Sequence, residues 1–510
     1  MKKIILLKRA AAAGVVFAVI VGVLFGGYAY AKDKRFNMSY MYFGDTQAFI
    51  RNVDKTKGSL DTVSPSYFDL DAAGNLVLNG AASRDFVEEM EQRDIRVVPF
   101  LSNHWDRAKG RAALANREVL ARQVADAVME YDFDGVNVDI ENLTETDREA
   151  YVDLVRLIRE ELPKRKEVSV AVAANPRGLN TGWQGSYDYK ALARYSDYLM
   201  IMAYDEHSEG SIQGPVASIS FVEESIKYAL RQVPADKIVL GIPFFGRYWK
   251  MGRGYGGYGL HLSKVQELVG TFNGKVEFDQ HTASPKATIS VTSRGGPVRV
   301  TNGVLDPGTY VIWFENEQSI KHKLRLVQKY RLKGAGSWSL GQETGQTWDY
   351  FNDWLNGNWF VDTYGHWAQH EITEMEEMGW MQGVSSTHFA PDNPLTRAQA
   401  AAIMVRALGL EKGQAAGNFS DVTSWHWASK EIGIAAEHGI MQGKGNGRFG
   451  PEDPLTREEM AVVLERITDI DEEDRDGEEI SFRDVDRNRW SYPAIHEMSR
   501  RGIFMGYDDG

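Results

Sequence analysis

The stretch Phe133-Asp-Gly-Val-Asn-Val-Asp-Ile-Glu-Asn-Leu143 decides the fold, because it predicts a buried β-strand with an unusual polar face. Asn137, Asp139 and Glu141 alternate with branched apolar residues, and a strand sends alternate side chains to opposite faces. One face would therefore carry two carboxylates and an amide. Burying such groups costs desolvation free energy, and acid–base chemistry is the obvious use for them. The alternative is a solvent-facing edge strand, against which the branched apolar face argues.

Short apolar strands alternate with amphipathic helices from residue 36 to about residue 355. The expected strands are 37–43, 63–69, 95–101, 134–141, 168–174, 197–203, 238–242 and 335–340. The expected helices include 84–93, 112–131, 145–160, 218–232 and 318–331. This alternation predicts an α/β protein with a (β/α)₈ TIM barrel over residues 36–355. Residues 251–312 interrupt the rhythm, so we expect a small α+β insertion there, between strands 7 and 8.

Polar and aromatic residues lie at the ends of three of these strands. Glu141 ends strand 4, and Tyr204 and Asp205 follow strand 6. Trp338 lies in strand 8. Barrel enzymes carry their catalytic groups at the carboxyl ends of strands, so these residues are expected to face one cleft. A buried tryptophan is more often part of a core than a ligand platform, and Trp338 alone leaves both roles open.

Composition and charge narrow the expected partners and cofactors. The chain has 58 basic and 71 acidic residues, a formal net charge of −13, whereas nucleic-acid-binding proteins are usually basic. It has no cysteine, which excludes disulfides, zinc–thiolate sites and a cysteine nucleophile. His207 near Asp205 has no neighbours at metal-ligand spacing. We therefore expect no nucleic-acid partner, no metal and no other cofactor.

The N-terminus has the pattern of an export signal. Met1-Lys2-Lys3 and Lys8-Arg9 form a basic start, residues 10–30 are apolar or small without charge, and Ala29-Tyr-Ala31 is a small-x-small site. The apolar run approaches the roughly 20 residues that span a bilayer. Residues 1–31 are therefore predicted to be a signal peptide or an uncleaved membrane anchor. Both possibilities place the remainder outside the membrane.

The tail from residue 358 repeats at a fixed spacing. Trp367 and Trp427 lie 60 positions apart, as do Arg397 and Arg457, and a fixed period indicates a repeated module, here two helices with a loop. We assign an all-α repeat to each of 358–415 and 416–475 and a partial third copy to 480–510. Because the third copy stops at Gly510 before a Thr-Arg element, we expect the protein to continue beyond it.

Two residue types in the tail repeats have open roles. Arg397 and Arg457 could bind an anionic polymer, because arginine forms bidentate charge-assisted hydrogen bonds. The alternative is that each arginine braces its own helix turn. Trp367 and Trp427 are expected to pack in the cores of their modules.

The barrel region resembles glycoside hydrolase family 18, the chitinase-type family. The resemblance rests on Asp134-Gly-Val-Asn-Val-Asp-Ile-Glu141, Met202-Ala-Tyr-Asp205, Tyr310-Val-Ile-Trp-Phe-Glu315 and Trp338. The tail resembles S-layer homology (SLH) modules, which bind secondary polymers of the Gram-positive cell wall. Together these resemblances imply an extracellular glycosidase at the wall or S-layer of such a bacterium, with a polysaccharide containing N-acetylglucosamine as substrate.

The family resemblance implies substrate-assisted retaining hydrolysis. Glu141 would protonate the glycosidic oxygen, and the 2-acetamido oxygen of the substrate would attack its own anomeric carbon. Asp139 would hold the acetamido N–H, and Tyr204 would hydrogen-bond the acetamido oxygen. The other residues expected to bind the sugar are Asp205, Met202 and Trp338, the last of these beneath the ring at the −1 position.

Asn137 departs from the family pattern, because many members carry aspartate at this position. An amide cannot take up a proton, but it can donate a hydrogen bond to Asp139, so we expect Asp139 to stay ionised. The asparagine resembles the branch of cell-wall and spore-cortex glucosaminidases more than secreted chitinases. The ending Trp338-Ser-Leu-Gly-Gln-Glu343 favours the same branch.

Other functions stay open at this point. The barrel could belong to a surface chitinase, or to a carbohydrate-binding protein that has lost catalysis. The tail could be a protein-interaction solenoid. Lectin relatives usually replace the acid at the position of Glu141, whereas this chain keeps it together with Asp139 and Tyr204. The sequence therefore favours an active N-acetylglucosaminidase of the cell envelope, acting on peptidoglycan or a related polymer.

Overall fold

The computed structural model describes residues 34–292, 297–300, 303–363, 365–385, 387–410, 419–468 and 482–506. The chain forms two compact units, one that ends at Gly357 and one that includes the residues from Asn358 onward. The segment 1–31, expected to be a signal peptide or anchor, lies outside the described residues. Within the described ranges, no helix has the length and apolar character needed to cross a membrane.

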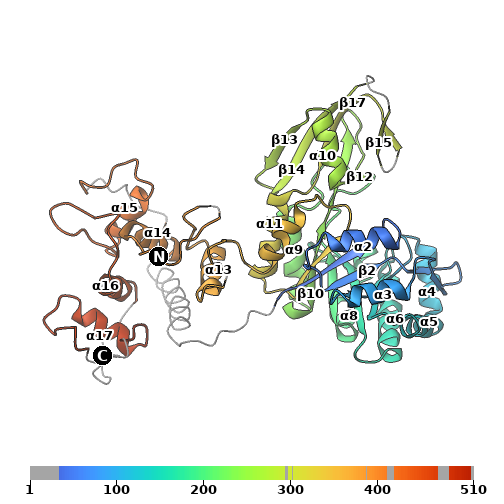
Figure 1. The fold of residues 1–510 in the computed structure, drawn as a ribbon, viewed down its shortest axis with the longest axis horizontal. Coiled ribbons are helices and arrows are strands. Elements are labelled where there is room, and N and C mark those ends of the chain that lie inside the picture. The colour runs from blue at the N-terminus through green and yellow to red at the C-terminus, as the bar shows by residue number, and fades with distance from the viewer. Residues whose placement is uncertain are drawn as a thin grey trace. The chain divides into compact units, whose positions relative to one another are not determined.

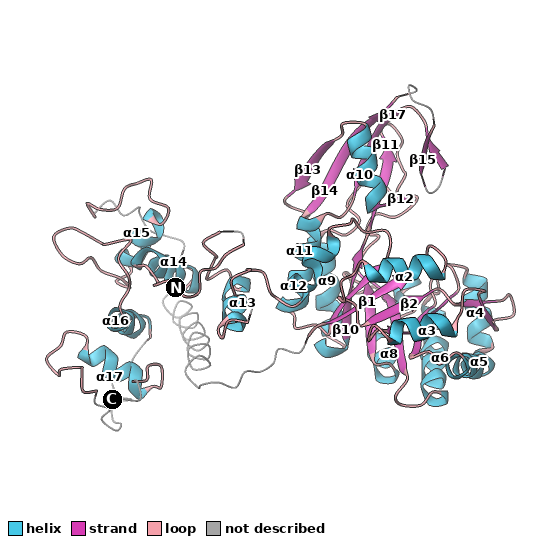
Figure 2. Ribbon diagram, viewed as in Figure 1, coloured by secondary structure: helices cyan, strands magenta, loops and turns pink. Residues whose placement is uncertain are grey.

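The first unit is built on a ring of parallel strands, and helices lie around these strands (Figures 1 and 2). The strands are β1 (Phe36–Met41), β2 (Thr62–Pro65) with β3 (Phe68–Leu70), β5 (Arg96–Val97) with β6 (Phe100–Ser102), β7 (Gly135–Asp139), β8 (Glu167–Ala173), β9 (Tyr198–Met202), β10 (Ile238–Pro243) and β18 (Gly334–Trp338). Neighbouring strands pair from β6 through β10 to β18, β1, β2 and β5. Only Val98 and Pro99 separate β5 from β6, so this third strand closes the ring. The predicted (β/α)₈ barrel is confirmed.

Helices cover the outside of the ring and bury the apolar face of β7. The helices are α2 (Thr46–Asp54), α3 (Arg84–Glu91), α4 (Arg107–Ala115), α5 (Arg117–Glu130), α6 (Arg148–Glu161), α7 (Gly182–Gly185), α8 (Tyr189–Tyr195), α9 (Ile219–Leu230), α11 (Glu317–Lys329) and α12 (Thr347–Leu355). Val136, Val138 and Ile140 are fully buried in the core that includes residues of α5 and α6. Each such side chain stabilises the fold by roughly 1.5–3 kcal/mol. The opposite face of β7 leaves Asn137 and Asp139 for the barrel interior.

An antiparallel sheet lies in the chain between β10 and β18. Its strands, in spatial order, are β12 (Tyr258–His261), β11 (Phe245–Lys250), β17 (Gly308–Trp313), β14 (Ser284–Val291) and β13 (Lys275–Asp279). Helix α10 (Leu262–Thr271) and the hairpin of β15 (Val298–Val300) and β16 (Gly303–Leu305) belong to the same segment. The sheet begins at Phe245, before the expected start at residue 251, because β11 continues almost directly from barrel strand β10.

The second unit consists of short helices. They are α13 (Gln369–Glu377), α14 (Arg397–Ala407), α15 (Ser429–Glu437), α16 (Arg457–Ile467) and α17 (Tyr492–Arg500). Thr396 and Thr456 form equivalent capping boxes at the starts of α14 and α16. The second helix of one repeat packs on the first helix of the next, α14 on α15 and α16 on α17. The repeats therefore share one continuous core.

The tryptophans of the repeats do not fill this core. Trp367 is 74% exposed and Trp427 is 56% exposed, so the prediction that they pack inside their modules is wrong. Ala428, the residue after Trp427, is fully buried in the core together with Ile432. Because Ala428 and Ile432 already fill the inward face of the repeat, the indole of Trp427 lies at the surface.

The repeat arginines reach the next repeat rather than their own helix turn. Arg397 is 4% exposed and donates hydrogen bonds to Phe449 O (2.9 Å), Gln442 O (2.7 Å) and Glu459 Oε1 (2.7 Å). Arg457, at the equivalent position, is exposed and donates to the carbonyl oxygen of Met505 in the third repeat at 2.8 Å. Both arginines brace successive repeats, and polymer binding by either one stays a prediction.

Replacing Arg397 by methionine should destabilise the repeat unit by about 3–5 kcal/mol, because Glu459 would be left partly buried without its counter-ion. Arg457→Met removes the equivalent but exposed side chain and should cost about 1 kcal/mol. Urea unfolding of the full chain, followed by circular dichroism, measures both changes, with the barrel transition as internal reference. Equal losses at the two positions would contradict the buried clamp.

Candidate active site

A cleft of about 730 Å³ opens at the carboxyl ends of the barrel strands. It is lined by Phe43, Trp105, Asp139, Glu141, Trp183, Met202, Tyr204, Asp205, Ser208, Glu209, Phe245, Arg247, Gly259, Leu260, His261, Trp338 and Gln342. Six of the seven barrel residues expected at the sugar site share this lining. The seventh, Asn137, is fully buried and does not line the cleft.

Asp139 and Glu141 form a buried acid pair at the end of β7. Asp139 is 4% exposed, and its Oδ1 has no hydrogen-bond partner among the described residues. Burial raises the pKa of Asp139 to about 7. Burial also raises the pKa of Glu141 well above its usual range, and the negative charges of Asp139 and Asp205 add to the rise. The pair can therefore hold a proton near neutral pH, and the ionisation of Asp139 stays a prediction.

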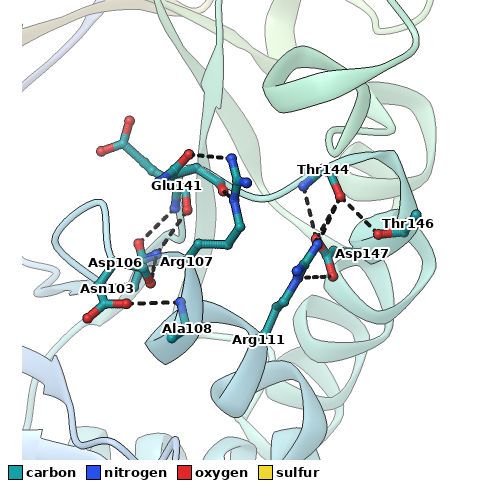
Figure 3. A network of polar contacts seen from close by, with 10 residues as sticks. Asn103, Asp106, Arg107, Ala108, Arg111, Glu141, Thr144, Thr146 and Asp147 are labelled. Atoms are coloured by element: carbon teal, nitrogen blue, oxygen red, sulfur yellow. Dashed lines mark hydrogen bonds and ion pairs between the residues drawn. The ribbon is translucent and has the colours of Figure 1, made fainter.

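Glu141 is positioned through its backbone. Asn103, just after β6, donates from Nδ2 to Glu141 O (2.9 Å) and accepts from Glu141 N at Oδ1 (2.8 Å). Arg107 holds the next residue, Asn142, through its carbonyl (2.6 Å) and Oδ1 (2.8 Å). In Figure 3 the carboxylate of Glu141 points away from this network and carries no dashed line. The backbone contacts thus fix the acid and leave its carboxyl group for the cleft.

Asn137 belongs to a chain of hydrogen bonds inside the barrel. Its Oδ1 accepts from Tyr40 Oη (3.0 Å), and its Nδ2 donates to Ser169 Oγ (2.8 Å). Ser169 in turn donates to Glu167 Oε1 at 3.3 Å. The amide expected to donate to Asp139 is therefore directed to Ser169, because the register of β7 against β8 sets Asn137 opposite Ser169.

The segment between β10 and β18 supplies a cation to the cleft. Arg247 in β11 holds Asp205 with two hydrogen bonds of 2.7 Å, from Nε to Oδ1 and from Nη2 to Oδ2. Burial raises the pKa of Tyr204, so its hydroxyl stays protonated and can donate. No motif in the sequence marked Arg247, because only the crossing of β11 over the barrel end brings it to Asp205.

Trp338 is held at the cleft by other aromatic rings. Its ring centroid lies 5.3 Å from that of Tyr40 and 6.0 Å from that of Phe100. Trp338 is partly exposed and lines the cleft, whereas Met202 is 8% exposed and belongs to the interior cluster beneath. This placement favours a platform role for Trp338 over a purely core role.

Two further tryptophans border the cleft. Trp105 follows β6 and is 50% exposed, and Trp183 lies in α7 after β8. Their rings meet edge to face, with centroids 4.9 Å apart at 72°. Trp183 was not predicted, and its only sequence signal is an aromatic residue in a Gly-rich loop after strand 5. Among the described residues, no group of His, Asp and Glu is suited to hold a metal ion.

Comparison with known proteins agrees with this geometry. The chain is similar to the uncharacterized glycosylase YvbX of Bacillus subtilis (strain 168), with 22% identity over 343 residues that cover 65% of this chain and 95% of that protein. It is 29% identical to the cortical fragment-lytic enzyme of the same organism over 249 residues, 48% of this chain and 56% of that protein. The chain thus spans about half the length of this second relative.

A solved structure and two family models complete the comparison. The crystal structure of a chitinase from Chromobacterium violaceum ATCC 12472 matches with a TM-score of 0.56 and 25% identity, over 63% of this chain and 99% of that chain. The S-layer homology domain matches residues 360–401, 418–461 and 481–510. The model of glycosyl hydrolases family 18 matches residues 42–343, more than half of the chain. The chain therefore belongs to glycosyl hydrolase family 18 and carries S-layer homology domains in its C-terminal part.

Proposed function

We propose that this glycosidase cleaves β-linked polymers containing N-acetylglucosamine in the bacterial envelope, peptidoglycan or spore cortex, by substrate-assisted retaining hydrolysis. The observation that carries the proposal is Asp139 Oδ1, a buried acceptor without a partner in the part of the chain that the structure describes, at a cleft that also contains Glu141. Leaving a buried acceptor unpaired costs about 1–3 kcal/mol. The N–H of a 2-acetamido group would remove that cost on binding.

The first step breaks the glycosidic bond. Glu141 donates its proton to the glycosidic oxygen, and the leaving sugar departs with that proton. The acetamido oxygen attacks the anomeric carbon and forms a cyclic oxazolinium ion. Asp139 accepts the hydrogen bond from the acetamido nitrogen and stabilises the positive charge, while the hydroxyl of Tyr204 donates to the acetamido oxygen. The raised pKa of Glu141 supports its role as the acid.

The second step opens the oxazolinium ion. Glu141, now a carboxylate, removes a proton from a water molecule that attacks the anomeric carbon. Two displacements at this carbon retain its configuration, and Glu141 is protonated again at the end. Trp338 supports the sugar ring during both steps. Arg247 holds Asp205 in place, which keeps a negative charge near the acid pair.

The similarity to a cortical fragment-lytic enzyme and the S-layer homology domains support a wall polymer as substrate. The similarity to a chitinase keeps external chitin as the second candidate. A carbohydrate-binding protein without catalysis is the alternative from another class. The acid pair with raised pKa values supports activity over this alternative.

The S-layer homology domains indicate association with the bacterial cell surface. We propose that they bind a secondary cell-wall polymer and so hold the enzyme at its substrate. The buried clamp of Arg397 makes this arginine a brace between repeats. Arg457, which is more exposed, is the better candidate for contact with an anionic polymer.

Digestion of purified peptidoglycan, spore cortex and chitin in parallel, with mass spectrometry of the new reducing ends, tests the substrate. We expect reducing N-acetylglucosamine from peptidoglycan or cortex. Glu141→Gln should still bind the same glycan but lose about 10²–10⁴-fold in turnover, because the proton donor is gone. Release from chitin alone would exclude a wall substrate, and full activity of the glutamine variant would show that Glu141 is not the acid.

Replacing Asn137 by aspartate should move the alkaline limb of the kcat/KM profile to higher pH. A second negative charge inside the barrel disfavours ionisation of Asp139 and Glu141, so their pKa values rise further and the acid form persists to higher pH. Asn273→Asp makes the same chemical change on the exposed surface and should leave the profile unchanged. An unshifted profile in the Asn137 variant would disprove this coupling.

A further inference from the structure

A side cavity of about 430 Å³ adjoins the catalytic cleft. Trp183, Met202, Tyr204 and Asp205 line both spaces, so the two lie side by side at the catalytic groups. The side cavity extends from these residues toward the loop after β8, where Arg177 lies, and toward the start of α9. A substituent on a bound sugar could therefore enter it from the cleft.

Arg177 is the cation of this cavity that has no partner among the residues that the structure describes. It is exposed, and it makes no hydrogen bond or ion pair with any residue in the described ranges. The acids of the cavity, in contrast, are all engaged. Asp205 is held by Arg247, Glu224 pairs with Lys227 at 2.9 Å, and Glu206 accepts a hydrogen bond from Ser218 N at 2.8 Å. Among the charged side chains that line this cavity, the one available to a ligand is therefore the positively charged Arg177.

The position of the leaving sugar would bring one of its substituents close to this side cavity. Glu141 protonates the glycosidic oxygen, so the leaving sugar lies beyond this oxygen in the cleft that Trp105 and Trp183 also line. In a β-1,4-linked polymer this oxygen is O4 of the leaving sugar, and O3 is on the adjacent carbon. A group attached at O3 would therefore lie next to the scissile bond and the shared wall of Tyr204 and Asp205.

We propose that the side cavity binds a carboxylate-bearing substituent at O3 of the leaving sugar, with Arg177 as its counter-ion. This inference rests on the proposed function, and it separates two substrate classes. Peptidoglycan carries such a group, a lactyl ether, on alternate sugars, whereas chitin has a plain hydroxyl at O3. The carboxylate is that of the lactyl group itself or one from the peptide attached to it.

The test compares Arg177→Gln with the parent on three substrates. These are glycan strands with the peptides removed, strands with intact peptides, and oligomers of N-acetylglucosamine from chitin. On the strand type that supplies the carboxylate, kcat/KM should fall about fivefold, as for a partly solvated ion pair, and the loss should shrink at high salt. On the chitin oligomers the variant should match the parent. Lys190→Gln removes an exposed charge on α8 as the matched control.

The outcomes distinguish a failure of the side-cavity site from a failure of the proposed function. If the parent cleaves peptidoglycan strands and Arg177→Gln cleaves each strand type as fast as the parent does, the side-cavity site is wrong while the proposed function stands. An equal loss on chitin oligomers would also overturn it, because the effect would then be general. A parent that cleaves only chitin oligomers would refute the wall substrate, and the side-cavity site with it.

Discussion

The burial of two carboxylates at the end of one barrel strand is the constraint around which the catalytic unit is arranged. Asp139 and Glu141 cannot both stay ionised in a site of low polarity without a large free-energy cost. The surroundings raise the pKa values of both groups, and Asn103 fixes the acid through its backbone. The charge of Asp205 adds to the rise in the pKa of Glu141, and Arg247 holds Asp205 in place. The pair can therefore share a proton, and Asp139 can accept a hydrogen bond from the acetamido N–H of the substrate.

The segment between β10 and β18 forms part of the site rather than an appendage to the barrel. Phe245 and Arg247 come from β11, and His261 ends β12, and all three line the cleft. One wall of the cleft thus depends on an antiparallel sheet that the barrel fold does not require. In the tail, buried side chains such as Arg397 bind each repeat to the next one.

The alternation in residues 133–143 predicted both the strand and its inward acids, because the period of two is a local property of the chain. The strand ends at Tyr204, Asp205 and Trp338 were likewise predictable from their positions after apolar runs. Arg247 and Trp183 were not, because their roles arise from segments that meet only in the folded protein. The hydrogen-bond partner of Asn137 could not be predicted, because it depends on the register of β7 against β8. The exposure of Trp427 could not be predicted either, because it depends on which face of the repeat is already filled by core residues.

The central claim is that the acetamido oxygen of the substrate, rather than a group of the protein, attacks the anomeric carbon. The most direct measurement is kcat/KM for a series of substrates whose N-acetyl group at the cleaved sugar carries zero, one, two or three fluorine atoms. Fluorine weakens the carbonyl oxygen as a nucleophile with little change in shape. The account predicts that the rate falls with each added fluorine. A rate independent of fluorination would contradict it.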